Sequence, residues 1–117
     1  ITLHAPALPI TEHMINADTI QSMRDGVIIV NTARGSLINT DALFSALKTG
    51  KIRYALLDVL EHEQNFEDNK ELITLPQVIT TPHIAFFADD SMKQIYHETF
   101  ESIDQYLQGK LIKNVLK

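Results

Sequence analysis

Val27-Ile28-Ile29-Val30-Asn31-Thr32-Ala33-Arg34-Gly35 is the stretch that decides the fold of this 117-residue chain. Its apolar half runs without alternation, which is typical of a strand buried on both faces of a parallel sheet. Residues 54–57 repeat the pattern before Asp58, and residues 78–81 repeat it before Pro82-His83. The sequence therefore predicts three strands, each of which delivers polar residues at its carboxyl end.

A helix is predicted between the first two of these strands. Asn39 or Thr40 can cap its first turn, Lys48 lies in its last turn, and Gly50 ends it. The apolar residues that share one face of this helix are Leu43, Phe44 and Leu47. A strand, a helix and another strand in succession indicate an α/β fold with a parallel sheet.

A shorter helix is predicted upstream of the first strand. It begins at about Asn16 or Asp18, ends at Arg24, and is followed by Gly26. The residues that we expect it to bury are Ile20 and Met23. This helix would lead the chain into the strand that starts at Val27.

The carboxyl-terminal third is predicted to hold one long amphipathic helix. Asp89 and Asp90 place negative charge in its first turn, and Gly109 follows its end about five turns later. Its apolar residues recur at spacings of three and four: Met92, Ile95, Tyr96, Phe100, Ile103 and Leu107. The polar connection over residues 61–75 is predicted to contain only a short helical turn near residues 70–75.

The composition limits the classes of partner. A formal charge of −5 with scattered Lys and Arg argues against nucleic acid, and 44% hydrophobic residues suit one globular core. The longest apolar run, residues 84–88, is far shorter than the roughly 20 residues of a membrane span. The chain has no cysteine and no secretory signal pattern, so we expect a cytoplasmic protein that binds small molecules or proteins.

Arg34, Asp58 and His83 each follow a predicted strand, where ligands bind in open parallel sheets. The planar guanidinium of Arg34 suits a carboxylate, and Gly35 would let the backbone turn close to a ligand. An arginine in a surface ion pair is the alternative for Arg34. The three positions together favour a site that holds an anionic substrate and moves a proton.

His83 is the candidate proton donor, because an imidazole ionises near neutral pH. A carboxylate beside it would stabilise the imidazolium, and both Glu61 and Glu63 are available, so the spacing leaves the partner open. The other histidines considered are expected to be solvated: His13, His62 and His97. No two histidines are four residues apart, and we predict no metal site.

Four motifs in order resemble the carboxyl-terminal part of the D-isomer-specific 2-hydroxyacid dehydrogenase family. The motifs are Ile1-Thr2-Leu3-His4-Ala5-Pro6, Val30-Asn31-Thr32-Ala33-Arg34-Gly35, Leu57-Asp58-Val59 and Thr80-Thr81-Pro82-His83-Ile84-Ala85. By this resemblance Arg34 binds the substrate carboxylate and carbonyl, His83 gives a proton to the carbonyl, and Glu63 pairs with His83. Glu61 then has no role in the reaction.

The resemblance also implies NAD as the cofactor and a 2-oxo or 2-hydroxy acid as the substrate. Hydride chemistry would belong to the cofactor, while the protein supplies orientation and charge. Asp58 would lie beside the nicotinamide. The other residues implied to line the cofactor are Ala5, Pro6, Thr11, Thr32, Ala33 and Arg34. Thr32 has the alternative of bonding its own loop.

Gln64 and the pair Phe86-Phe87 resemble the D-lactate and D-2-hydroxyisocaproate branch of the family. Pyruvate and D-lactate are therefore the expected substrate pair, and Phe86 would line an apolar substrate pocket. Ordinary packing in a core or a domain interface is the alternative for both rings. The segment from Glu63 to His83 is shorter than is usual in that branch, which leaves the exact substrate open.

None of the four glycines forms the G-x-G pair that a dinucleotide fold requires. We therefore expect an incomplete fragment of a two-domain enzyme. Residues 1–85 would be the second half of a Rossmann-like NAD-binding domain, and residues 86–117 a helix returning to the substrate domain. The intact protein is expected to be a homodimer, and the fragment alone inactive.

Two alternatives to an enzyme stay open at this point. The first is a non-enzymatic, dinucleotide-sensing scaffold or corepressor with the same fold, and the second is a structural fragment without activity. Arg34, Glu63 and His83 together favour the enzyme.

Overall fold

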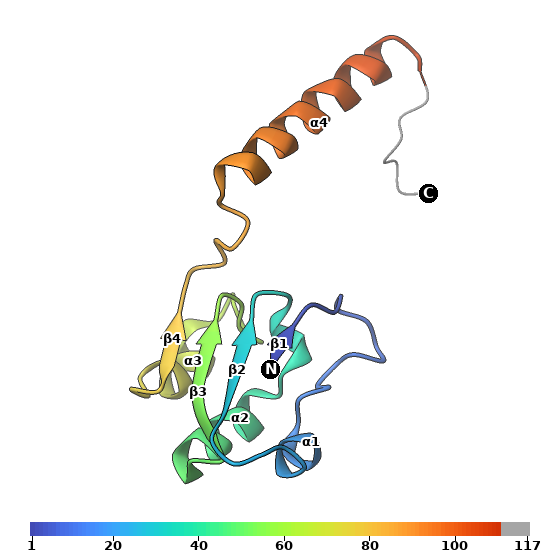
Figure 1. Ribbon diagram of the computed structural model, residues 1–117. Helices are drawn as coiled ribbons and strands as arrows, with labels where there is room; N and C mark the ends of the chain where they lie inside the picture. Colours follow the sequence, from blue (N-terminus) through green and yellow to red (C-terminus); the bar gives the residue numbers. More distant parts are fainter. Residues whose placement is uncertain (111–117) are drawn as a thin grey trace. The chain divides into compact units, whose positions relative to one another are not determined.

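The computed structural model describes residues 1–110, and the chain divides after Ile84 into two compact units (Figure 1). The elements of the first unit are β1 (Thr2–Leu3), α1 (Ala17–Gln21), β2 (Val27–Asn31), a 3₁₀ turn (Gly35–Leu37), α2 (Thr40–Thr49), β3 (Ile52–Leu57), α3 (Phe66–Ile73) and β4 (Val78–Thr80). The second unit contains α4 (Asp89–Leu107). No helix within residues 1–110 is both long and apolar enough to cross a membrane.

The first unit is built on a sheet whose strands lie in chain order, β1-β2-β3-β4, and are all parallel. Asn31 at the end of β2 pairs with Leu57 at the end of β3, and Leu57 pairs with Thr80 of β4. The carboxyl ends of these three strands therefore meet at one edge of the sheet. This arrangement confirms the predicted α/β fold with a parallel sheet.

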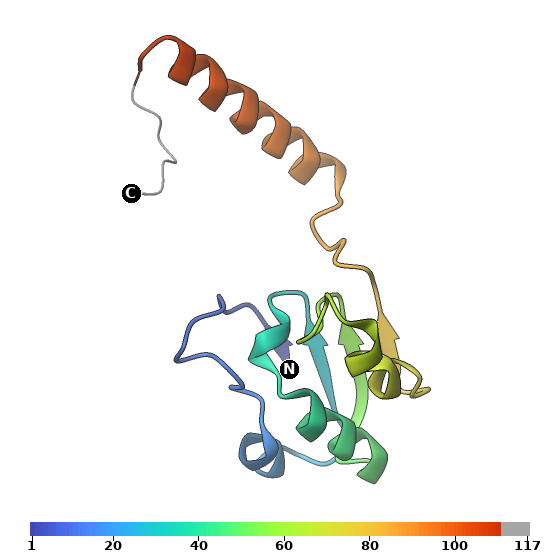
Figure 2. The ribbon, with the colours of Figure 1, turned by 180° about the vertical axis from the view of Figure 1, so that it is seen from behind.

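One face of the sheet is covered by α2 and α3, which lie in front of the strands in Figure 2. The core between them contains Ile29, Leu37, Leu43, Leu47, Ile52, Ala55, Leu57 and Leu72. Each of these side chains is almost fully removed from solvent, and burying an aliphatic side chain contributes about 1.5–3 kcal/mol. This face of the sheet, together with α2 and α3, forms a well-packed hydrophobic core.

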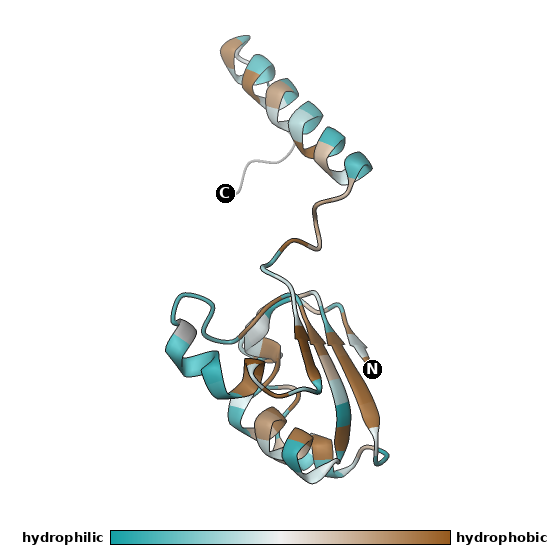
Figure 3. Cartoon of the chain, turned by 90° about the vertical axis from the view of Figure 1, so that its left-hand side faces the viewer, coloured by the Kyte–Doolittle hydropathy of each residue, from teal (hydrophilic) through white to brown (hydrophobic). Residues whose placement is uncertain are grey.

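The opposite face carries exposed apolar side chains, which we call the bare face. It is made by Ile28, Tyr54, Leu56 and Ile79, which are 43%, 39%, 36% and 59% exposed. Register places Ile28 beside Tyr54 and Leu56 beside Ile79, so these side chains share one surface. The prediction of burial on both faces is wrong within residues 1–84, because the helices there cover one side only (Figure 3).

Helix α2 forms as its sequence predicts. The Asn39 carboxamide oxygen accepts a hydrogen bond from the Ala42 N–H at 2.9 Å, and Gly50 ends the helix at a φ of 78°. Leu43 and Leu47 are buried, while Phe44 is only partly buried against the core. Capping and a glycine stop are local signals, so they could be interpreted without knowledge of the rest of the fold.

The carboxyl-terminal boundary of α1 (Ala17–Gln21) differs from the prediction. Asn16 caps α1, but the helix ends at Gln21 rather than Arg24, and the chain then turns so that the Gly26 N–H donates to the Lys51 carbonyl. Ile20 is buried as expected, and Met23 is only partly buried. These contacts set the direction in which the chain enters β2.

Helix α3 is longer and earlier than the turn predicted near residues 70–75. It spans Phe66–Ile73, with Glu67 and Asp68 in a first turn where negative charge is favourable. Among its residues with described side chains, Asn69 and Leu72 are buried. A polar residue at a buried position obscures the apolar periodicity, which is why the sequence pattern missed this helix.

Helix α4 spans 19 residues, and the prediction of a long amphipathic helix is confirmed. None of its residues is buried. Its large exposed apolar side chains are Ile95, Tyr96, Phe100, Ile103, Tyr106 and Leu107. The assignment of residues 86–117 to a separate domain stays a prediction.

Candidate active site

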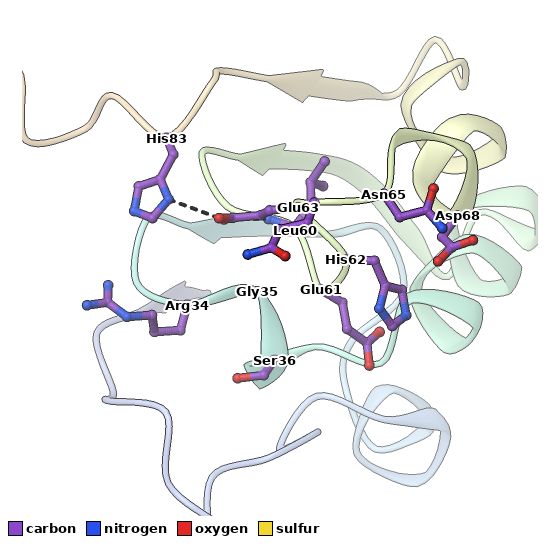
Figure 4. A pocket seen from close by; sticks show the side chains of 11 residues that line it. Arg34, Gly35, Ser36, Leu60, Glu61, His62, Glu63, Asn65, Asp68 and His83 are labelled. Atoms are coloured by element: carbon purple, nitrogen blue, oxygen red, sulfur yellow. Dashed lines mark hydrogen bonds and ion pairs between the residues drawn. The ribbon is translucent and has the colours of Figure 1, made fainter.

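A pocket of about 470 Å³ lies at the carboxyl edge of the sheet. Arg34, Glu63 and His83 all line it, although they come from three different connections (Figure 4). The remaining lining residues are Gly35, Ser36, Leu60, Glu61, His62, Gln64, Asn65 and Asp68. The structure therefore brings together the three residues for which the sequence predicts a role in the reaction.

The backbone of His83 adopts a left-handed conformation with a φ of 54°. Non-glycine residues rarely adopt this region, which costs about 1–3 kcal/mol and persists where the surroundings enforce it. Here the His83 N–H donates to the carbonyls of Asp58 and Thr81, at 2.9 and 3.0 Å. This strained turn directs the imidazole into the pocket (Figure 4).

His83 is paired with Glu63. The distance from His83 Nδ1 to Glu63 Oε2 is 3.1 Å, and Glu63 Oε1 accepts a hydrogen bond from the Leu60 N–H at 3.3 Å. The two side chains are 49% and 40% exposed. Because Glu63 occupies Nδ1, the other ring nitrogen, Nε2, has no protein partner within the described residues and is available to a ligand.

Glu61 has a different set of partners. Its Oε1 binds His13 Nε2, and its Oε2 accepts the Thr40 N–H at 2.8 Å. Burial raises the pKa of Glu61, but the hydrogen bonds with Thr40 and His13 lower it by more, so the net shift is downward. Glu61 therefore joins three segments of the first unit. The spacing could not choose between the two glutamates, and the structure places Glu63 on His83.

The three histidines that the sequence predicts to be solvated divide into two kinds. The expectation that His13 is solvated is wrong, because it binds Glu61 and adopts a φ of 48° in a half-buried loop. His62 is exposed and lines the pocket, and the side chain of His97 is 80% exposed on α4. Within residues 1–110, no group of three or more His, Cys, Asp or Glu side chains is placed to hold a metal ion.

Arg34 lies at the mouth of the pocket on a loop that Asn31 holds. The fully buried Asn31 amide donates to the Arg34 carbonyl at 2.9 Å and accepts the Ala33 N–H at 3.0 Å. The exposed Arg34 guanidinium uses Nη1 to bind the Ala33 carbonyl at 2.6 Å. Sequence reasoning gave Asn31 no role, although a polar residue closing an apolar strand was a signal for one.

Gly35 permits a close approach, but to the protein's own backbone rather than to a ligand. A Cβ atom at this position would lie 1.9 Å from the Leu60 carbonyl oxygen and 2.6 Å from the Glu61 nitrogen. Only glycine fits such a contact. The loop that carries Arg34 is therefore pressed against the loop that carries Glu63.

Asp58 links the ends of β3 and β4. Its side chain is buried, and Oδ1 accepts hydrogen bonds from the Thr81 hydroxyl and from the Ile84 N–H, the latter at 2.9 Å. Its backbone carbonyl also accepts the His83 N–H. Asp58 thus fixes the turn that presents His83, whatever contact it makes with a cofactor.

The other predicted cofactor residues lie in the loops that follow β1 and β2. Thr11 folds the first loop, donating its hydroxyl to the Pro6 carbonyl at 2.7 Å and accepting the Leu8 N–H at 2.9 Å. Ala5 packs against the core. Ala33 does the same in the second loop, and the exposed Thr32 hydroxyl makes no hydrogen bond within residues 1–110. Their contacts with a cofactor stay predictions.

Phe86 belongs to the second compact unit. Its ring is half exposed and lies edge-on to Phe87, with 6.4 Å between ring centroids. Its predicted place in a substrate pocket stays a prediction.

A four-stranded parallel sheet with an acid-paired histidine and an arginine at its carboxyl edge is an α/β domain with its candidate site where such sheets bind ligands. Residues 1–85 match the NAD-binding domain of the D-isomer-specific 2-hydroxyacid dehydrogenases. The chain belongs to this family, whose cofactor is NAD.

Named relatives agree with this assignment. An NAD⁺-dependent D-2-hydroxyacid dehydrogenase of Clostridioides difficile is 44% identical over 114 residues, covering 87% of this chain and 34% of the relative. An aromatic 2-oxoacid reductase of Clostridium sporogenes is 39% identical over 126 residues, covering 97% of this chain and 38% of the relative.

Among solved structures, a D-lactate dehydrogenase from Treponema pallidum superimposes with a TM-score of 0.93 at 35% identity. The match covers 100% of this chain and 39% of that structure. The chain thus spans between a third and two fifths of the length of these relatives.

Proposed function

We propose that this chain is the part of an NAD-dependent D-2-hydroxyacid dehydrogenase that holds the substrate carboxylate and the proton donor. The full-length protein would interconvert a 2-oxo acid and a D-2-hydroxy acid. One observation carries the proposal: the His83–Glu63 pair and Arg34 line the same pocket at the carboxyl edge of the sheet. If Arg34 only formed a surface ion pair, or if His83 were only solvated, there would be no reason for the two residues to line one pocket.

Arg34 is proposed to bind the substrate carboxylate. Its guanidinium spends one nitrogen on the Ala33 carbonyl, which orients the group and leaves further N–H donors in the same plane. Two parallel hydrogen bonds to a carboxylate would fix the acid with its carbonyl toward His83. A lysine at this position could supply the charge but not the planar pair of donors.

His83 is proposed to be the general acid in the reduction direction. The Nε2 proton would move to the substrate carbonyl oxygen as that oxygen gains negative charge, and the same nitrogen would take the proton back in the oxidation of the alcohol. Glu63 accepts the Nδ1 proton, which fixes the ring and stabilises its protonated form. Glu63 is therefore a positioning and electrostatic partner.

The residues present fit a nicotinamide cofactor. Asn31 holds the loop that presents Thr32 and Ala33, and the exposed Thr32 hydroxyl forms no hydrogen bond with residues 1–110, so it can bind a ligand at that loop. We propose that the cofactor is held by Ala5, Pro6, Thr11, Thr32, Ala33, Arg34 and Asp58. When bound, NADH supplies the hydride.

Pyruvate and D-lactate are the substrate pair that we propose, with Phe86 beside the substrate side chain. The similarity to a D-lactate dehydrogenase supports this pair, and the similarity to an aromatic 2-oxoacid reductase makes a larger substrate the main competitor. We further propose that residues 1–85 form half of the NAD-binding domain, that residues 86–117 return to a substrate domain, and that the full-length protein is a cytoplasmic homodimer.

Steady-state oxidation of NADH by the full-length protein tests the proposal, with pyruvate and phenylpyruvate as alternative substrates. Turnover of pyruvate with the higher kcat/KM supports the D-lactate assignment, and a preference for phenylpyruvate replaces it with an aromatic 2-oxo acid. Tight NADH binding without turnover of either acid would favour a dinucleotide-sensing scaffold. Absence of NADH binding would leave only a structural role.

A further inference from the structure

A buried carboxamide, Asn69 of α3, lies behind the turn that carries Glu63. The residue is 1% exposed. Its Nδ2 donates to the His62 carbonyl at 2.7 Å and to the Asn65 carbonyl at 3.1 Å. Both protons of one side-chain amide are thus used on the main chain immediately before and shortly after Glu63.

The same side chain is costly to bury. Its carbonyl oxygen, Oδ1, has no hydrogen-bond partner within the described residues, and an orphaned buried acceptor loses the free energy of its contact with water. An apolar residue of similar shape would avoid that cost beside the core residue Leu72. The two hydrogen bonds to the His62 and Asn65 carbonyls therefore explain why an asparagine occupies this position.

These two bonds hold residues 62–65 in a tight turn, which the Asn65 N–H closes by donating to the His62 carbonyl at 2.9 Å. On the other side of Glu63, the Glu61 side chain is fixed by His13 and Thr40. The main chain is therefore anchored on both sides of Glu63. From this turn the Glu63 carboxylate reaches across to the His83 ring (Figure 4).

Anchoring matters because the His83–Glu63 pair is itself exposed. An ion pair with this much solvent contact is worth little when both side chains must lose freedom to form it. A turn that already directs Glu63 toward His83 removes part of that entropic cost. We propose that Asn69 is a positioning residue for the His83–Glu63 pair, an inference that rests on the proposed function of that pair.

The surroundings of His83 distinguish Glu63 from the other charged groups. The charged groups that line the pocket with it are Arg34, Glu61, Glu63 and Asp68, along with the titratable His62. Asp58 is bonded to Thr81 and Ile84. Within residues 1–110, Glu63 is the one side chain that forms a hydrogen bond with the His83 ring, so the position of Glu63 decides how the ring is held.

The test is the steady-state kcat for reduction of the 2-oxo acid by the full-length protein. Glu63→Gln is expected to lower kcat by roughly 10-fold, because it removes the charge that orients the His83 ring. Asn69→Leu, which keeps the branched shape and removes the amide, is expected to lower kcat in the same direction with the KM for NADH unchanged. In the double variant the second change should add almost nothing.

Two controls separate positioning from loss of stability. Ile20→Val weakens the core at α1 without touching the Glu63 turn, and should leave kcat unchanged. His97→Gln changes an exposed histidine of α4 outside the pocket and should also leave kcat unchanged. Asn69→Ala replaces the leucine variant if leucine prevents folding, as judged by circular dichroism.

The proposal is overturned if Glu63→Gln lowers kcat and Asn69→Leu does not, an outcome that leaves the proposed function of the pair intact. An unchanged kcat in Glu63→Gln would overturn both the inference and the role of Glu63. Losses that multiply in the double variant, or failure of both Asn69 variants to fold, would show that Asn69 acts on the fold and not through Glu63.

Discussion

The carboxyl edge of the sheet and its bare face differ in what satisfies their side chains. At the edge, the buried polar groups Asn31 and Asp58 form hydrogen bonds within residues 1–84. On the bare face, apolar side chains such as Ile28 and Ile79 are about half exposed. The comparison teaches that residues 1–84 contain the hydrogen-bond partners that shape the edge, whereas nothing within these residues covers the apolar side chains of the bare face.

The largest effect is expected at the contact between the two loops of the edge. Gly35→Ala would place a methyl group against the Leu60 carbonyl, where the loops cannot separate without losing the bonds of Asn31 and Glu61. We expect a loss of at least about 3 kcal/mol in the free energy of unfolding, measured by urea denaturation. Ser36→Ala, one residue away, is the control. A stable Gly35→Ala variant would show that the edge is pliable.

His83→Gln tests whether the edge carries chemistry as well as structure. In the full-length protein we expect turnover of the 2-oxo acid to fall by about 100-fold or more, the usual effect of removing a general acid, with little change in NADH affinity. Steady-state kinetics and NADH fluorescence measure the two quantities. His97→Gln changes an exposed histidine outside the pocket and should leave both unaltered. Equal turnover in wild type and His83→Gln would remove His83 from the reaction.

The bare face is expected to drive self-association of the 117-residue chain, because contiguous exposed apolar surface associates in water. Ile79→Lys places a charge at the most exposed position of this surface and should shift the chain toward monomer, by roughly 10-fold in dissociation constant. Light scattering over a dilution series measures the change. Thr80→Lys, on the neighbouring position of the same strand, is the matched control. A wild-type chain that is monomeric at every concentration would contradict the interpretation.

The smallest effect is expected at Glu61, on the flank of the edge. Its pKa in the folded chain is lowered from the ordinary value of 4.5, so its stabilising contribution is present above pH 4.5 and is lost as the pH falls through the folded value. Glu61→Gln should reduce the free energy of unfolding by about 1 kcal/mol at pH 7. The difference from wild type should shrink below pH 4.5. Urea denaturation across this pH range measures it, with the exposed Glu12→Gln as control.

Local signals in the sequence predicted much of the fold. The apolar runs that form β2, β3 and β4 and the Asn39 cap of α2 all depend on neighbours a few residues away. Helix α3 was placed too late because one of its buried residues is the polar Asn69, which interrupts an apolar repeat. The exposure of Leu56 depends on which faces the helices cover, and no pattern within a strand contains that information.

The site was predictable to the level of residue type and strand end, but its internal pairing was not. The choice between Glu61 and Glu63 is settled by Thr40 and His13, which lie 21 and 48 residues from Glu61 in the chain. The hydrogen bonds of Asn31 and Asn69 likewise depend on turns that only the folded backbone defines. Spacing identifies the groups that meet at a sheet edge, and folding decides which of them touch.

The contact at Gly35 has a consequence for how this scaffold could be re-engineered. The backbone of Gly35 contacts the backbone of Leu60 and Glu61, so the backbone itself sets the separation between the loop that carries Arg34 and the loop that carries Glu63. A designer who wants a longer or bulkier acid cannot widen that gap by exchanging side chains. The positions that can be changed are other residues that line the pocket, such as Ser36 and Gln64. Their replacement would alter the pocket volume without separating the two loops.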